Sequence, residues 1–156
     1  MTQTQLIAEP GVQALSVVRE FAATPELVFK IMNDPDLIPQ WWGPRRLTTV
    51  VEKMELRPGG QWRFIQHDAA GHEFAFHGVY HEIAAPTRVV QTFEFEGFPG
   101  HVILETVTFT EQAGKTIMTG NYVYQSVEDR DGMLQSGMES GQRESYERLE
   151  ELLVKA

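Results

Sequence analysis

Glu105 is the side chain in this sequence best suited to acid–base chemistry. Ile103, Val107 and Phe109 share its parity in the strand expected there, so all four side chains point to one apolar side. A carboxylate in such surroundings loses hydration, which raises its pKa toward values useful for proton transfer. A strand bulge, or a position near the open end of the sheet, would instead leave Glu105 in water.

Two tyrosines could join Glu105 at one site. Tyr122 and Tyr124 lie on the expected inward face of the following strand, so a phenol and a carboxylate could converge on one ligand. Ordinary core tyrosines with satisfied hydroxyls would give the same pattern. Glu105 and Tyr122 are therefore the catalytic candidates. The sequence shows no Ser-His-Asp grouping, phosphate loop or dinucleotide fingerprint, so no nucleophilic mechanism has a candidate.

The histidines do not have the spacing of a metal site. His77 and His81 are four residues apart, which on a strand separates them by about 13 Å, too far to share an ion. His67 and His72 flank an expected hairpin turn, but no third ligand is evident. The chain has no cysteine, which removes disulfides and thiolate ligands. We expect surface histidines, no metal and no cofactor.

Composition points to one domain over residues 1–156. A chain of this length buries roughly 68 to 70 per cent of its unfolded surface, which is enough for one core. The net charge of -9 argues against nucleic acid and acidic membranes as partners. No apolar run approaches the roughly 18 residues of a membrane span. We expect a cytoplasmic protein without membrane insertion; a homodimer stays open.

The order of the elements follows from caps, prolines and turns. Residues 12–21 have the β-branched, apolar character of a first strand. Thr24 and Pro25 then supply a cap and a first helical residue, and Asp34 with Pro35 repeat that signal, which predicts two short helices. From residue 48 onward, turn residues separate five or six strands, and a long helix is expected over residues 128–153.

The two large elements each present a face suited to a cavity. Aromatic side chains alternate onto one side of the strands, while polar side chains occupy the other. On the helix, a period of 3.6 aligns Leu134, Met138, Gly141, Ser145, Leu149 and Leu152. Small residues near the middle of that stripe suggest space beneath the helix. Gly141 would then either keep a cavity open or allow close helix–sheet contact.

Several motifs resemble those of a known superfamily. They are Trp41-Trp42-Gly43-Pro44, Pro58-Gly59-Gly60 before Trp62 and Phe64, Gly78 before Glu82 and Ile83 with Pro86 and Arg88 beyond, and Gly141 before Arg148 and Leu149. With the element order, they resemble the START/Bet-v (SRPBCC) superfamily and its bacterial branch named after the activator of heat-shock-protein-90 ATPase homologue. The resemblance covers about residues 12–153. It implies an α+β helix-grip fold: a curved antiparallel sheet wrapped around a long C-terminal helix, with two short helices after the first strand.

The resemblance also implies a cavity between sheet and helix that holds a small apolar molecule. We expect a binding protein without catalysis, with a cyclase- or hydrolase-like enzyme as the alternative. A chaperone-interaction module is the third hypothesis, and only the name of the branch supports it. The predicted ligand-binding residues are Trp42, Trp62, Phe64, Phe76, Tyr80, Phe93, Glu105, Tyr122, Tyr124, Met138 and Gly141.

Overall fold

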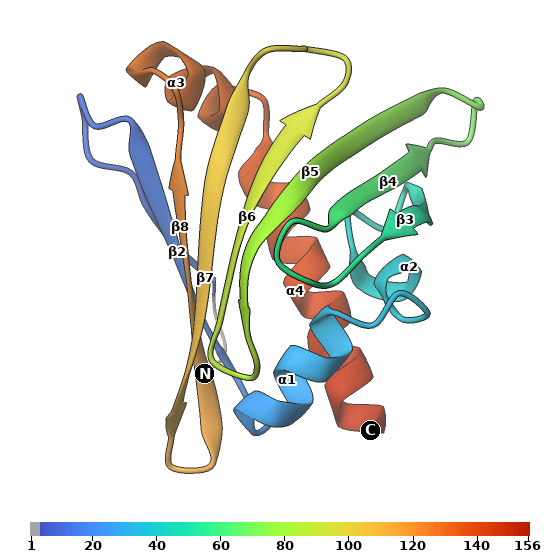
Figure 1. Ribbon diagram of the computed structural model, residues 1–156, viewed down its shortest axis with the longest axis vertical. Coiled ribbons are helices and arrows are strands. Elements are labelled where there is room, and N and C mark those ends of the chain that lie inside the picture. Colours follow the sequence, from blue (N-terminus) through green and yellow to red (C-terminus); the bar gives the residue numbers. More distant parts are fainter. Residues whose placement is uncertain (1–3) are drawn as a thin grey trace.

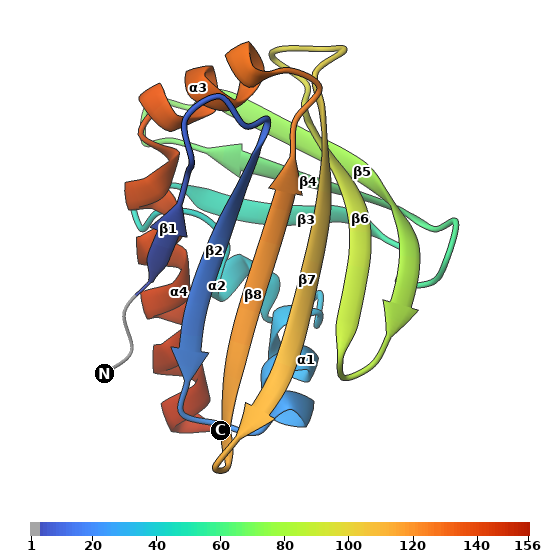
Figure 2. The ribbon, with the colours of Figure 1, turned by 90° about the vertical axis from the view of Figure 1, so that its left-hand side faces the viewer.

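An antiparallel sheet curves around a C-terminal helix in the computed structural model, which describes residues 4–156 (Figures 1 and 2). The strands are β1 (Gln5–Ile7), β2 (Ala14–Phe21), β3 (Thr48–Met54), β4 (Gln61–His67), β5 (Glu73–Ala84), β6 (Arg88–Phe95), β7 (Val102–Gln112) and β8 (Lys115–Val123). The helices are α1 (Pro25–Met32), α2 (Ile38–Trp41), α3 (Val127–Gln135) and α4 (Met138–Lys155). The strand order is β1-β2-β8-β7-β6-β5-β4-β3.

This architecture confirms the predicted α+β class with its curved sheet, two short helices and C-terminal helix. The expected first strand begins at Ala14, and the short strand β1 precedes it. That strand was not predicted. Its three residues pair with Ser16, Val17 and Val18 of β2 and are too few to show a period of their own.

The single long helix expected over residues 128–153 is two helices. Ser126 caps α3 by accepting a hydrogen bond from the backbone N–H of Asp129 at 3.1 Å. Gly137 then has φ +84°, a left-handed conformation that L side chains rarely adopt and that ends the first helix. The chain turns there, and α4 runs along the concave side of the sheet (Figure 1).

The two short helices lie beside α4. The Thr24 side chain caps α1 by accepting from the backbone N–H of Leu27, and Pro25 occupies the first turn, as the sequence predicts. α2 contacts both α4 and β3, while α1 contacts α4, β7 and β8. In Figure 1, α1 lies at one end of the space between sheet and helix, α3 lies at the opposite end, and α2 lies at the side next to β3.

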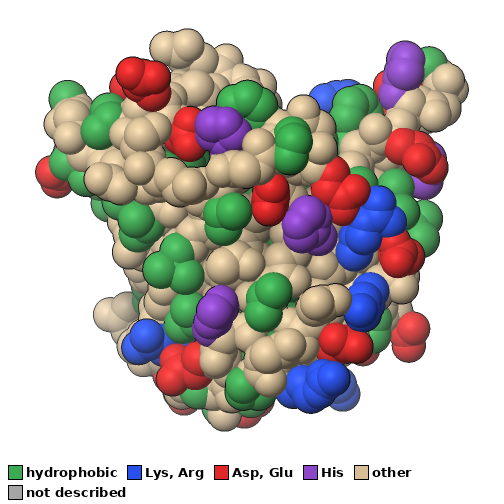
Figure 3. Space-filling model, turned by 45° about the horizontal axis from the view of Figure 1, so that its top comes forward, with side chains coloured by type: hydrophobic (Ala, Val, Ile, Leu, Met, Phe, Trp, Pro, Cys, Tyr) green, Lys and Arg blue, Asp and Glu red, His purple; other side chains and the backbone are tan. Residues whose placement is uncertain are grey.

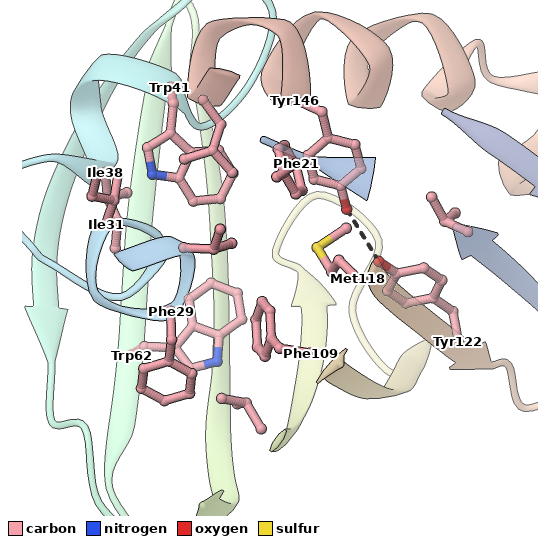
Figure 4. Close-up of a cluster of buried hydrophobic side chains, with 14 of the residues drawn as sticks. Phe21, Phe29, Ile31, Ile38, Trp41, Trp62, Phe109, Met118, Tyr122 and Tyr146 are labelled. Atoms are coloured by element: carbon pink, nitrogen blue, oxygen red, sulfur yellow. Dashed lines mark hydrogen bonds between the residues drawn. The ribbon is translucent and has the colours of Figure 1, made fainter. Parts of the chain in front are cut away.

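The core lies between the concave face and the helices, where Figure 4 shows side chains from both layers facing one another. Phe21 and Met118 of the sheet and Leu149 of α4 have no accessible surface. Fully burying a side chain of this kind stabilises the fold by about 1.5–3 kcal/mol. Within residues 4–156, no helix is long and apolar enough to cross a membrane.

Candidate ligand site between the sheet and the last helix

Glu105 lies on the concave face of β7. Its neighbours in register are Gln91 of β6 and Tyr122 of β8. The pairing of β7 with β6 over residues 102–108 and with β8 over residues 104–112 has no register shift. The bulge considered from the sequence is therefore not present at this position. The side-chain amide of Gln91 donates a hydrogen bond from Nε2 to Oε1 of Glu105 at 3.1 Å.

The environment of Glu105 favours the neutral carboxyl group. Burial raises the pKa of Glu105 to about 8, and the hydrogen bond from Gln91 opposes this in part. The residue as a whole nevertheless keeps part of its accessible surface. Glu105 is therefore a mostly protonated carboxyl group at neutral pH that still borders on accessible space.

The hydroxyl group of Tyr122 is paired with that of Tyr146 on α4. The hydroxyl oxygens of Tyr122 and Tyr146 lie 3.5 Å apart, as the dashed line in Figure 4 shows. The side-chain Nε2 of Gln142 donates to both hydroxyl oxygens at 3.3 Å. Burial raises the pKa of Tyr146 to about 12 and that of Tyr122 well above its ordinary value, so both phenols stay protonated.

The two remaining tyrosines of the predicted site are buried as well. Tyr80 is 2% exposed and Tyr124 is 5% exposed. Burial raises the pKa of both hydroxyls, and the charge of Glu105 adds to the effect at Tyr124. Tyr124 therefore lies within electrostatic range of Glu105, on the side of the cluster near α3.

Aromatic rings cover the concave face from β4 to β6. Trp42 reaches this face from the end of α2, with its ring centroid 5.1 Å from that of Phe64 and 5.3 Å from that of Phe76. Phe93 lies 5.4 Å from Phe76 and 5.9 Å from Trp62. These edge-to-face and tilted contacts form one continuous aromatic group.

The predicted site residues differ in how much surface they keep. Trp62, Phe64, Tyr80, Tyr122 and Tyr124 are buried, and the indole N–H of Trp62 donates to the Thr92 carbonyl at 3.2 Å. The residues with part of their surface accessible are Trp42, Phe76, Phe93, Glu105, Met138 and Gly141. The first set packs the core, while the second set borders on accessible space.

Gly141 does not face the sheet. A Cβ added at Gly141 would meet only Cδ of Pro44 within 4 Å, at 3.9 Å. Ser145, one turn further along α4, accepts a hydrogen bond from the Gly43 backbone N–H at 2.8 Å. The small stripe of α4 therefore packs on residues 43–44, so both predicted alternatives for Gly141, an open cavity beneath it and close helix–sheet contact, are wrong.

Glu105 and Tyr122, with their hydrogen-bond partners, form a polar cluster on the concave face. Three of its members were not predicted from the sequence: Gln91, Gln142 and Tyr146. Gln91 shares the parity of Val89 and Phe93, which is the signal that could have placed it inward. Gln142, Tyr146, Leu149 and Leu153 have helical spacing and form the face of α4 that meets the sheet. The predicted stripe was rotated from this face because it favoured small residues.

His67, His72, His77 and His101 each lie beside a carboxylate. Nδ1 of His72 lies 2.8 Å from Asp68, and Nδ1 of His101 lies 2.9 Å from Asp129. Figure 3 shows histidine, acidic and basic side chains together on one exposed face. Among residues 4–156, no three His, Asp or Glu side chains are arranged to hold a metal ion.

A separate surface groove beside α1 is lined by Phe29, Lys30, Asn33, Asp34, Pro35 and Leu56.

Comparison with known proteins places this geometry among similar folds. A model of the family described as "Activator of Hsp90 ATPase homolog 1-like protein" matches residues 22–154. A solved structure from Rhodobacter sphaeroides is 25% identical with a TM-score of 0.91, and covers 99% of each chain. One from Arthrobacter aurescens is 26% identical with a TM-score of 0.88, covering 97% of this chain and 92% of that one. A third, from Mycobacterium smegmatis, is 25% identical with a TM-score of 0.86, covering 98% and 97%. The search of curated proteins found no match.

Proposed function

Because the chain belongs to the family of activator of Hsp90 ATPase homolog 1-like proteins, we propose that it uses the helix-grip fold to bind a small molecule. The ligand is largely apolar or aromatic and lies between the concave face of the sheet and α4. Binding, without a covalent step, is the main activity.

One observation carries this proposal. Phe76, Phe93 and Glu105 point toward the concave side and yet keep accessible surface, as does Met138 at the start of α4. Protein interiors are close-packed, so a side chain on a fully filled interior face would lose its surface. Inward side chains that keep it support the presence of space for a ligand.

The chemistry of these side chains indicates the ligand class. Phe76, Phe93 and Trp42 offer ring faces and edges to an aromatic molecule. Met138 has a flexible, polarizable side chain that adapts to irregular shapes. Apolar walls with a few polar groups are typical of small-molecule sites. The neutral state of Glu105 agrees with an uncharged ligand.

Titration with the uncharged fluorescent probe N-phenylnaphthylamine tests the proposal. The wild-type protein should bind the probe saturably, and Phe93→Trp should weaken binding about tenfold because the larger ring occupies the same space. Leu104→Trp is the matched control, since Leu104 lies on the other face of β7 and is 43% exposed. Equal losses in both variants, or no saturable binding by the wild type, would refute the proposal.

A cyclase- or hydrolase-like activity on the bound molecule is the second candidate. The raised pKa of Glu105 supports it, because a carboxyl group with a pKa of about 8 can exchange protons near neutral pH. Native mass spectrometry of the purified protein would identify a copurified molecule to use as substrate. Glu105→Gln should then retain binding and lose turnover; turnover unchanged in this variant would exclude the activity.

A further inference from the structure

The polar cluster on the concave face has hydrogen-bonding capacity that its own members do not use. Oε1 of Glu105 accepts the hydrogen bond from Gln91, which fixes the orientation of the carboxyl group. Within the part of the chain that the structure describes, Oε2 of Glu105 has no hydrogen-bond partner. Because burial keeps the group protonated near neutral pH, its second oxygen can present an O–H donor.

The tyrosine pair has a second unused donor. Gln142 supplies both N–H groups of Nε2, one to each hydroxyl oxygen. At most one of the two hydroxyl protons can lie in the contact between Tyr122 and Tyr146. The other proton meets no acceptor among residues 4–156. One phenolic O–H therefore has no acceptor within the described chain.

The two donors belong to neighbouring positions. Glu105 and Tyr122 are directly opposite in the antiparallel register of β7 and β8, so their Cβ atoms are about 4.5–5.5 Å apart. The charge of an ionised Glu105 would act on the hydroxyls of Tyr122, Tyr124 and Tyr146. No hydrogen bond joins the carboxyl group to these hydroxyls within the described chain. An acceptor atom between them would complete the network.

We propose that Glu105 and the Tyr122–Tyr146 pair bind the carbonyl oxygen of an uncharged aromatic ketone, whose ring system lies against Phe93 and Phe76. This inference rests on the proposed function and adds the polar group by which the ligand is recognised. A protonated carboxyl group beside a tyrosine is a known arrangement for holding such an oxygen.

The same geometry discriminates against two related ligands. A hydrocarbon of the same shape would leave both donors without an acceptor, which costs affinity. A carboxylate ligand would bring a negative charge beside Glu105, and the arginines whose charge reaches Tyr124 and Tyr146, Arg130 and Arg19, are held by other partners. Arg130 donates to the carbonyls of Glu9 and Ala14, and Arg19 donates to the carbonyl of Glu20.

Affinity for the ketone should also depend on pH. The groups that face Glu105 are Gln91 on β6, Tyr122 on β8, Tyr124 directly after β8, and Gln142 and Tyr146 on α4. The amides do not titrate, and the tyrosines have raised pKa values. Glu105 is thus the group that changes charge between about pH 6 and pH 9, and its carboxylate only accepts hydrogen bonds.

Three probes of one shape test this inference by calorimetric titration: acetylnaphthalene, ethylnaphthalene and naphthoate. At about pH 6, the wild type should bind the ketone about tenfold tighter than the hydrocarbon, from two neutral hydrogen bonds, and should bind naphthoate most weakly. Glu105→Leu should reduce the preference for the ketone to about threefold, because one phenolic donor remains, without weakening hydrocarbon binding. Tyr122→Phe should reduce the preference, whereas Thr106→Val, which removes a hydroxyl on the outer face of β7, should leave it unchanged.

The pH dependence of the ketone preference gives a second test if Glu105→Leu fails to fold. The wild-type preference should fall as the pH rises through about 8, whereas Glu105→Gln keeps an N–H donor and should hold its preference constant. Binding of no probe would refute both the proposed function and this inference. Equal binding of ketone and hydrocarbon by the wild type, a ketone preference that Glu105→Leu leaves unchanged, or tightest binding of naphthoate would overturn this inference alone.

Discussion

Glu105 links the stability of the fold to pH. Its pKa is about 8 in the folded protein because of burial, compared with 4.5 for a free glutamate. Below about pH 4.5 the carboxyl group is neutral in both states. As the pH rises from there to 8, only the unfolded chain releases the proton, so folding becomes less favourable. We expect Glu105 to lower the free energy of unfolding by a few kcal/mol across this window.

Urea unfolding at pH 5 and pH 8 checks this linkage. Glu105→Gln has the same shape without an ionisable group. The free energy of unfolding of this variant should therefore exceed that of the wild type by more as the pH rises. Glu111→Gln is the control, since Glu111 is exposed on the same strand and should leave the wild-type profile in place. A constant difference between wild type and Glu105→Gln at both pH values would contradict the raised pKa.

Glu96 shows the opposite effect on the outer face. Arg63 binds its carboxylate through two hydrogen bonds of 2.7 and 2.9 Å, and Nδ1 of His77 lies 2.9 Å from it. Arg63 is the main cause that lowers the pKa of Glu96 to about 2, with His77 a smaller one. Arg63→Gln should therefore raise this pKa toward 4.5 by more than His77→Gln does.

Carbon NMR titration of the carboxyl groups measures both effects directly. The stability that the lowered pKa provides is present above about pH 4.5 and is lost as the pH falls toward 2. Because the pair is partly exposed, this contribution should be small. An unchanged titration of Glu96 in Arg63→Gln would show that the ion pair does not form in solution.

At the scale of elements, glycine conformation sets where the C-terminal helix begins. Gly132 lies within α3, and Gly137 separates α3 from α4. A Cβ added at either position would meet nothing within 4 Å, so the two sites differ in backbone conformation rather than in space. Only Gly137 has a positive φ, at +84°. This pair therefore isolates the cost of the left-handed conformation.

Alanine at each position should have opposite effects. Gly137→Ala should destabilise the protein by about 1–2 kcal/mol, because an L side chain strains the left-handed backbone. Gly132→Ala should stabilise it by up to about 1 kcal/mol, because alanine restricts the unfolded chain and favours helix. Chemical unfolding of both variants measures the difference. Similar stabilities would indicate that α3 and α4 are not separated at Gly137.

At the scale of the whole molecule, Arg148 connects α4 with α2 and with the residues that follow α2. Arg148 donates to the carbonyls of Gly43 and Pro39, at 2.8 and 3.4 Å. Burial lowers the pKa of Arg148, which reflects its partly dehydrated position. These bonds hold the segment that carries Trp42 against α4, and so position one wall of the proposed ligand site.

Arg148→Met should remove both hydrogen bonds and keep most of the apolar part of the side chain. Two carbonyls would lose their donor, so we expect destabilisation of about 1–3 kcal/mol and weaker probe binding. Arg45→Met is the comparison, because the Arg45–Glu151 pair is exposed and its loss should change stability little. Thermal unfolding and titration with N-phenylnaphthylamine on both variants decide; equal effects would contradict a specific role for Arg148.

The sequence by itself determined the properties that depend on local periodicity. Alternation along the strands was enough to place Phe76, Phe93, Glu105 and Tyr122 on one face, because side-chain direction in a regular strand has a period of two. The cap at Thr24 and the proline after it located α1, since these residues act within one turn. The order of these elements, with the resemblance, was enough for the fold class.

Only the tertiary structure decided which distant residues meet. The rotation of α4 brings Gln142 and Tyr146 to Tyr122, and the strand order places Gln91 beside Glu105. Neither follows from a local pattern, because helix rotation depends on how the whole apolar face packs against the sheet. Small residues on α4 suggested space beneath the helix, but they pack on residues 43–44 of a loop. Packing between layers, and not periodicity within them, sets the composition of the polar cluster.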